Sequence, residues 1–223
     1  SPLKRWAFIG KLYPFEYVLK EEVVNTTDLR RYIVDMIFEE NPLLYVAKSD
    51  CDEDRSVQIA TILEDACEKE IEQPNGVKVE QPWFARDRYG ETVLHKAIQK
   101  RREKVALHFL SLKKVELLLA AGDPFLFLAI EHKCHGVAQK ILDLVDQHSL
   151  KTLPSSNTRR TVLQDGGTLL TSNTGRTVLH DAPKCKGDFV KQVVKRYPEL
   201  LKQTDDDGVR ACSFEHLANY NCC

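Results

Sequence analysis

Two stretches of this chain spell nearly the same phrase, Gly-x-Thr-Val-Leu-His-x-Ala, at 90–97 and again at 175–182. A phrase that recurs within one chain is typical of repeat proteins, whose small units bury their apolar faces only against neighbouring units. Chains of this kind build a scaffold whose surface binds a partner. The repeat therefore bears on function as well as on fold, although the phrase does not identify the partner.

The first copy of the phrase predicts the start of a helix. Gly90 can adopt the positive φ of a turn, and Thr92 can cap the helix that comes next. Leu94, Ala97 and Ile98 then fall on one helical face. A second apolar stripe, at 115–119, predicts another helix that ends at the Gly-Asp-Pro of 122–124.

Two later segments have the same plan. The second unit lacks the Thr and His of the phrase, but Ala129 stands 32 residues after Ala97. Eight residues separate Ala129 from Val137, and eight also separate Ala182 from Val190. This shared internal spacing supports a repeat more strongly than the opening phrase alone.

The pattern resembles the ankyrin-repeat family, whose unit of about 33 residues carries a Thr-Pro-Leu-His-x-Ala signature. The segment at 117–124 is similar to that family's repeat ending, and Asp-Asp-Asp-Gly at 205–208 is similar to its inter-repeat turn. The resemblance implies an all-α, ankyrin-repeat-like solenoid of stacked helix-turn-helix units with short hairpin turns. It also implies that His95 and His180 tie the turn of one repeat to the next through hydrogen bonds.

The period divides the chain into regions that match the repeat to different degrees. Asn-Pro-Leu-Leu-Tyr-Val-Ala at 41–47 and the apolar positions of 57–63 fit a degraded unit, and 29–37 fits an amphipathic helix before it. We therefore expect an N-terminal helical cap or degenerate repeat at 1–40, a degenerate repeat and linker at 41–85, and ankyrin-like repeats at 86–223, with an insertion at about 149–173.

The insertion contains a near copy of the segment that comes after it. Eight of ten positions of 156–165 recur sixteen residues later at 172–181. We expect the second copy to take the place in the stack, because it has Gly175 at the turn where the first copy has Arg159. The first copy should form an exposed excursion, either without a role or as a protruding finger that adds to the binding surface.

Composition excludes several classes of function. The net charge is −1, with 43% hydrophobic and 29% charged residues, which argues against bulk nucleic-acid binding through excess Lys and Arg. No apolar run reaches the roughly 18–20 residues of a membrane span, so we expect no membrane insertion by this segment. The seven cysteines are odd in number and form no Cys-x-x-Cys pair, which favours a reduced, cytoplasmic compartment.

Candidate catalytic and metal-binding residues are few. No nucleophile stands at a spacing that would place it beside His95 or His180, so we expect no enzyme and no cofactor. His132, Cys134 and His135 lack the second ligand cluster that a tight metal site needs. At 205–208 a calcium loop is excluded, because His216 replaces the glutamate that would end it. The basic run at 100–104 is a solvated helix face or turn, or else a contact for an acidic partner.

Aromatic and arginine residues cluster just before the first clear repeat. Trp83 and Phe84 either fill the gap left by the irregular linker or belong to a binding hot spot, for which Trp, Tyr and Arg are preferred. In the family resembled, turn tips and inner helices form the concave recognition face. Carried over by position, this implies partner-binding roles for Arg86, Arg88, Tyr89, Lys96, Asp181, Asp205 and Asp206.

We therefore expect a scaffold that binds a partner protein through its concave face and turn tips. The alternative is a cytosolic ankyrin regulatory domain of a larger membrane protein, because irregular arrays with long fingers look like those of transient-receptor-potential channels. The chain begins with Ser rather than Met, which fits a piece of a longer protein.

Overall fold

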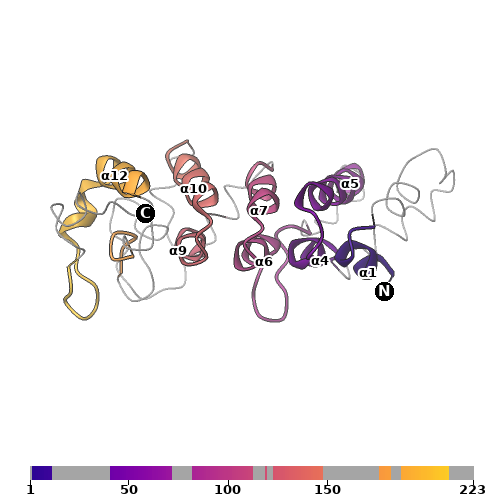
Figure 1. The fold of residues 1–223 in the computed structure, drawn as a ribbon, viewed down its shortest axis with the longest axis horizontal. Coiled ribbons are helices and arrows are strands. Elements are labelled where there is room, and N and C mark those ends of the chain that lie inside the picture. The colour runs from indigo at the N-terminus through magenta and orange to yellow at the C-terminus, as the bar shows by residue number, and fades with distance from the viewer. Residues whose placement is uncertain are drawn as a thin grey trace. The chain divides into compact units, whose positions relative to one another are not determined.

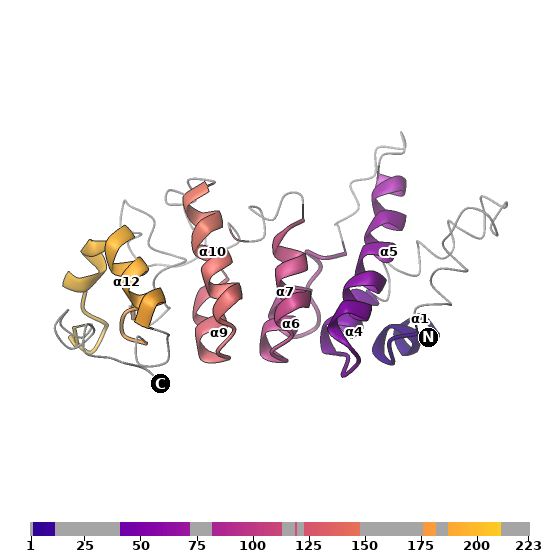
Figure 2. The ribbon, with the colours of Figure 1, turned by 45° about the horizontal axis from the view of Figure 1, so that its top comes forward.

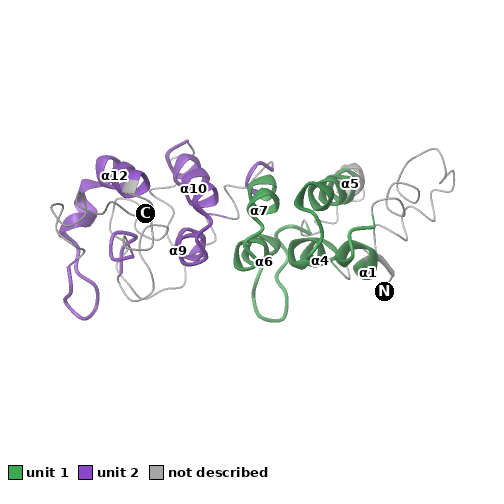
Figure 3. Ribbon diagram, in the orientation of Figure 1, with its two compact units in different colours: residues 1–109 green, residues 110–223 purple. Residues whose placement is uncertain are grey.

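The computed structural model describes residues 2–11, 41–71, 82–112, 119, 123–147, 176–181 and 187–210. Every regular element in those ranges is a helix (Figure 1), in agreement with the predicted all-α class. The helices are α1 (Pro2–Phe8), α4 (Leu43–Lys48), α5 (Glu53–Ile71), α6 (Val93–Gln99), α7 (Glu103–Leu110), α9 (Phe125–Glu131), α10 (His135–Gln147), α12 (Gly187–Arg196) and the 3-10 helix η3 (Pro198–Lys202). The chain divides into two compact units, 1–109 and 110–223 (Figure 3).

In the first unit the helices form two layers. α4 contacts α1 on one side and α6 on the other, and these three helices lie in one row, with α5 and α7 in a second row (Figures 1 and 2). The faces that meet are apolar and fully buried. They are contributed by Leu43, Val46 and Ala47 of α4, Ile59, Ala60 and Leu63 of α5, Leu94, Ala97 and Ile98 of α6, and Val105, Ala106 and Leu110 of α7.

Two helix pairs share one backbone plan, although they lie in different units. α6 and α9 are each seven residues long. They begin 32 residues apart, as do α7 and α10. The turn inside each pair contains a residue with a positive φ, 55° at Arg101 and 60° at Lys133. The period of 32 inferred from sequence is therefore also a period of backbone geometry in these two pairs.

The same hydrogen bond closes both turns. The N–H of Arg102 donates to the carbonyl of Ala97 (2.9 Å), and the N–H of Cys134 donates to the carbonyl of Ala129 (2.8 Å). A bond of this kind, across a residue in the left-handed region, satisfies a carbonyl at the end of the first helix. It also reverses the chain, so that the second helix packs back on the first.

Helix α1 ends with the same turn. The N–H of Lys11 donates to the carbonyl of Trp6 (3.0 Å) across Gly10, whose φ is 67°. Gly10 also packs closely on the loop after α4, because a Cβ built on it would lie 2.7 Å from Cβ of Cys51. A larger residue at position 10 would therefore clash with this loop.

Helix α7, which follows α6, was not predicted from the sequence, and it begins within the segment that was assigned to a basic surface run. The helix predicted at the apolar stripe of 115–119 is described only at Leu119, which is helical and buried, and the rest of that prediction lies outside the described residues. Lys100, Arg101 and Lys104 of the basic run are exposed as expected, but Arg102 is only 5% exposed.

Arg102 is buried because it bridges two loops of the first unit. Its Nη2 donates to the carbonyl of Cys51 (2.8 Å) and to Oγ of Ser56 (2.8 Å). Glu53 adds a second link, since its Oε2 accepts from the backbone N–H of Lys104 at the start of α7 (2.7 Å). A carboxylate at a helix N-terminus is favourable. These polar contacts join the α4–α5 pair to α7.

The degraded unit predicted around 41–70 is a helix-turn-helix, formed by α4 and α5. It departs from the other pairs because Ser49, which comes directly after α4, is extended rather than left-handed. The expected helix at 29–37, most of the segment at 117–124 and the whole duplicated insertion at 149–173 lie outside the described residues.

In the second unit, α12 is tied to α10 by polar side chains at its end. The hydroxyl of Tyr197 donates to Oδ1 of Asp146 (2.5 Å), and Arg196 forms ion pairs with Asp143 (2.9 Å) and Asp146 (3.0 Å). Burial and the neighbouring Asp146 carboxylate both raise the pKa of Tyr197, so the hydroxyl keeps its proton and remains a donor. Val193 of α12 is fully buried beside this contact.

Leu126 provides a test of the buried positions assigned by the repeat. The side chain is fully buried in α9, so Leu126→Asp places an unpaired carboxylate among apolar groups. We expect a loss of about 3 kcal/mol or more of the free energy of unfolding, measured by urea denaturation. Val209→Asp is the matched control, because Val209 is 56% exposed, and it should change stability by less than about 0.5 kcal/mol. Equal stabilities of the two variants would contradict the assigned core.

Candidate functional site

The residues just before α6 form a tight hairpin, 87–91, that is held by one carboxylate. Oδ1 of Asp87 accepts hydrogen bonds from the backbone N–H groups of Tyr89 (2.8 Å) and Glu91 (3.1 Å). The backbone closes the same loop, because the N–H of Asp87 donates to the carbonyl of Glu91 (2.9 Å). Gly90 has a φ of 76°, as the sequence predicted for this turn.

A second hairpin, 205–209, repeats this construction. Oδ1 of Asp205 accepts from the N–H groups of Asp207 (3.1 Å) and Val209 (2.8 Å), and the N–H of Asp205 donates to the carbonyl of Val209 (2.9 Å). Gly208 again has a φ of 76°. The turn predicted at 205–208 is therefore confirmed. Its identity with 87–91 was missed, although both segments read Asp-x-x-Gly-x.

The Thr and His of the repeated phrase make the same hydrogen bonds in both copies, at the start of α6 and in the turn at 177–181. The N–H of Thr92 donates to Nδ1 of His95 (3.1 Å), and the N–H of Thr177 donates to Nδ1 of His180 (2.9 Å). Each Thr hydroxyl also lies 3.0 Å from the same Nδ1. At the start of α6 this is a capping box in which histidine replaces the usual glutamate or glutamine, and it confirms the cap expected at Thr92.

The hydrogen bond from the N–H of Thr177 determines the tautomer of His180. Because a backbone N–H can only donate, Nδ1 of His180 accepts, and the proton of the neutral ring is on Nε2. That Nε2 lies 3.0 Å from the carbonyl of Val209 in the second hairpin. His180 therefore links its own turn, 177–181, to the hairpin at 205–209, as expected for the histidine of the phrase.

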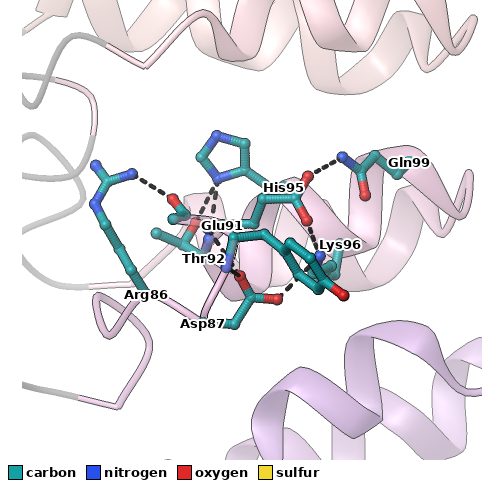
Figure 4. A network of polar contacts seen from close by, with 9 residues as sticks. Arg86, Asp87, Glu91, Thr92, His95, Lys96 and Gln99 are labelled. Carbon is teal, nitrogen blue, oxygen red and sulfur yellow. Dashed lines mark hydrogen bonds and ion pairs between the residues drawn. The ribbon is translucent and has the colours of Figure 1, made fainter.

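Lys96 of α6 stabilises the first hairpin through two ion pairs. Its Nζ forms ion pairs with Oδ2 of Asp87 (3.1 Å) and with the carboxylate of Glu91 (Figure 4). Glu91 also accepts a hydrogen bond from the side-chain amide of Gln99. Lys96 was expected on the partner-binding face, but only 7% of the residue is exposed and its charge is committed to these two carboxylates.

The electrostatics of this network favour a charged Asp87. Burial alone would raise the pKa of Asp87, but the hydrogen bond from the N–H of Tyr89 and the ion pair with Lys96 outweigh it. The pKa therefore lies below its usual value of 3.8. Arg86 also stabilises the hairpin, because its Nη1 donates a hydrogen bond to the carbonyl of Gly90 (2.7 Å, Figure 4). Arg86, also expected to contact the partner, is thus part of the hairpin's framework.

Arg88 and Tyr89 occupy the exposed tip of the hairpin. Tyr89 is 68% exposed, and the guanidinium of Arg88 lies 4.7 Å from the centroid of its ring. This distance is typical of a cation–π contact, which holds the two side chains together in solvent. The loop that carries them projects from the start of α6, away from α7 (Figure 1).

The other predicted binding residues belong to the second unit. Asp206 is exposed on the second hairpin, whereas Asp205 uses Oδ1 to hold that hairpin together. Asp181 is half-buried, and its Oδ1 lies 3.5 Å from Nη2 of Arg176. The structure thus brings Arg86, Arg88, Tyr89 and Lys96 together in the first unit, and Asp181, Asp205 and Asp206 belong to the second unit.

Trp83 has a structural position. It is 4% exposed and packs edge-on against Phe84, with ring centroids 6.2 Å apart. Asn41 ties the same loop to the start of α4, because its Nδ2 donates to the carbonyl of Pro82 (2.7 Å). Of the two roles considered for Trp83, filling the gap before α6 is the one its burial supports.

The remaining candidates form no site. Cys134, one of the three metal-ligand candidates at 132–135, is 2% exposed. In the part of the chain that the structure describes, no group of three or more His, Cys, Asp or Glu side chains is placed to hold a metal ion. Within the same residues, no helix combines the length and the apolar character needed to cross a membrane.

Comparison of the chain with family models, with curated proteins and with solved structures finds no match. The repeated turns, hairpins and caps described above are therefore the observations from which function is inferred.

The depressed pKa of Asp87 predicts how the stability contributed by the hairpin depends on pH. Asp87→Asn should lower the free energy of unfolding by about 1–2 kcal/mol at pH 7, because hydrogen bonds and an ion pair to a charged group are weakened. The stabilisation is fully present above the unfolded pKa of about 4 and is lost as pH falls through the lower folded pKa. Urea unfolding of both proteins should therefore show a gap that closes in acid.

Asp65→Asn is the matched control, since Asp65 is an exposed residue of α5. It should leave the free energy of unfolding at pH 7 within about 0.5 kcal/mol of the wild-type value. A gap for Asp87→Asn that stays constant from neutral pH to acid would contradict the assigned role of the carboxylate.

Proposed function

We propose that this protein is a binding scaffold of the ankyrin-repeat type, which recognises a partner protein through its turn tips. The observation that carries the proposal is the exposed pair Arg88 and Tyr89 on a hairpin braced by Asp87, Lys96 and Arg86. Tyr and Arg are the residue types over-represented in interface hot spots. An exposed tyrosine stacked by an arginine has no part in the core.

The bracing of the hairpin favours binding. Ordering a loop on association costs free energy. This loop is already ordered by two hydrogen bonds to Oδ1 of Asp87, an ion pair at its Oδ2, and the bond from its backbone N–H to the carbonyl of Glu91. The second hairpin has the same framework around Asp205 but presents acidic side chains at its tip. A constant framework with variable tips is how repeat scaffolds obtain specificity.

The ankyrin type of the scaffold is supported by three features. The helix pairs α6–α7 and α9–α10 repeat with a period of 32 residues, close to the unit of about 33 in that family. The same Thr–His hydrogen bond occurs in both copies of the phrase. His180 reaches the carbonyl of Val209 in the following turn. The proposed setting is the cytoplasm, for which the odd number of cysteines is the support.

Affinity capture with this chain, followed by mass spectrometry, would identify the partner, and variants of the tip would then test the proposal. Arg88→Ala combined with Tyr89→Ala should weaken binding by about 2 kcal/mol, or about 30-fold, because it removes the exposed side chains. Stability should change by less than about 1 kcal/mol, since neither side chain is buried. Arg86 is left intact because its removal would loosen the hairpin itself.

The matched control changes two exposed residues elsewhere, Lys195→Ala and Lys202→Ala, and should leave the affinity unchanged. Titration calorimetry with the purified partner measures both proteins. If the tip variant binds as tightly as the wild type, the hairpin is not the recognition element and the proposed function fails.

A further inference from the structure

A second surface of the first unit has the composition of a binding site. A pocket of ≈390 Å³ lies between α1 and α4 and is lined by Lys4, Arg5, Phe8, Tyr45 and Lys48. This volume is near the lower end of the range for ligand sites, roughly 300–1,000 Å³. The repeat pattern of the sequence did not point to it, because the five residues come from segments about 40 positions apart.

The pocket combines an aromatic floor with a cationic rim. The Nζ atoms of Lys4 and Lys48 each lie 5.7 Å from the centroid of the Tyr45 ring, so the ring makes a cation–π contact with two ammonium groups. Arg5 is exposed and adds a third cation. None of the five lining residues is acidic.

The positive charge extends beyond the pocket along the same unit. Burial lowers the pKa of Lys48, repulsion from Lys96, Arg88 and Lys100 lowers it further, and Asp87 raises it. Burial and the neighbouring cations therefore both disfavour the ammonium charge of Lys48. A carboxylate placed beside Lys48 would offset this repulsion.

Exposed apolar residues adjoin the charged rim. Phe8 and Ile9 are consecutive at the end of α1 and are 44% and 46% exposed. Tyr89, on the hairpin of the same unit, is 68% exposed. Exposed apolar side chains that gather beside polar groups mark interaction sites, whereas isolated ones do not.

We propose that this pocket binds an acidic peptide segment of a partner protein, with a large apolar side chain inserted against Phe8 and Tyr45 and flanking carboxylates paired with Lys4, Arg5 and Lys48. The proposal rests on the proposed function, since it names the chemistry of the partner that the scaffold recognises. Charge complementarity selects the acidic residues. The aromatic floor selects the apolar one.

A peptide fits this site better than a small molecule. Small-molecule sites bury about 70–90% of their ligand, and a pocket that five side chains line, two of them exposed, cannot enclose one. The bound group therefore needs contacts outside the pocket. A chain that continues past Lys48 meets the positive field of Arg88, whose hairpin carries the exposed Tyr89.

A fluorescein-labelled acidic peptide with a central tryptophan is the probe, and fluorescence anisotropy measures its affinity. Arg5→Glu and Lys48→Glu should each weaken binding about tenfold or more, because each replaces an attraction by a repulsion. Phe8→Ala should weaken binding several-fold by removing part of the apolar floor. Affinity should also fall with added salt, since the rim is open to solvent.

Three controls separate the parts of the proposal. Lys195→Glu makes the same change of charge at an exposed residue of α12 and should leave the affinity unchanged. A peptide with alanine in place of tryptophan should bind several-fold more weakly, and one with lysine in place of the acidic residues should not bind. Arg5 is exposed, so Arg5→Glu should melt at the wild-type temperature. A loss of peptide binding by this variant would therefore not be caused by misfolding.

Several outcomes would overturn the proposal. One is equal affinity of the wild type, Arg5→Glu and Lys48→Glu for the probe. Another is binding to vesicles that contain phosphatidylserine but not to the peptide, which would assign the surface to a membrane. A third is a lowered melting temperature of Phe8→Ala with no peptide binding by the wild type, which would mean that the chain itself covers the pocket.

The captured partner distinguishes this proposal from the one on which it rests. If the variant at Arg88 and Tyr89 loses the partner while Arg5→Glu and Lys48→Glu retain it, the pocket proposal fails and the scaffold function stands. If the tip variant retains the partner, the proposed function fails, whatever the peptide does.

Discussion

A short backbone turn with one residue in the left-handed region is the constraint on which this structure depends. It comes after α1, α6 and α9, and each time a backbone N–H reaches back to a carbonyl of the preceding helix. A helix of seven residues is too short to be stable alone in water. It persists because the turn folds a second helix against it and buries residues such as Ala97 and Ala129 completely. The hairpin at 87–91, which carries the proposed function, directly precedes one of these short helices, α6.

Apolar side chains stabilise the helices by packing between them, and polar side chains stabilise the loops by hydrogen bonds. Asp87 and Asp205 each hold a hairpin by accepting two backbone N–H bonds, and no apolar contact could fix so short a loop. Asp87 and Asp205 are thereby engaged within their own hairpins, as is the ammonium of Lys96. The function that we propose therefore assigns recognition to the side chains between the aspartate and the glycine. Resemblance to a family's binding positions overlooks this division, because it marks a position without showing whether the side chain is already engaged.

The sequence predicted those parts of the fold that are encoded locally. The cap at Thr92, the positive φ of Gly90 and the period of 32 result from residue types at fixed spacing, and all three are found. The turn before α7 was missed because Arg101 adopts the left-handed conformation in which glycine would have been the signal. The burial of Arg102 was also missed, since its partners lie in the loop after α4, about 50 residues away. Contacts between segments that are far apart in the sequence cannot be predicted from the periodic pattern of apolar residues.

The pocket and the hairpin of the first unit are linked through charge. Lys96 and Lys48 repel one another, and the pairing of Lys96 with Asp87 and Glu91 limits how much positive charge the inner helices present. If those carboxylates were absent, Lys96 would be a buried cation without an acidic partner, which is costly. Two members of the network that stiffens the hairpin, Lys96 and Asp87, thus also act on the charge of Lys48 at the pocket. Lys48 and Arg5 line the pocket that we assign to an acidic partner, and Arg88 is exposed on the hairpin of the same unit.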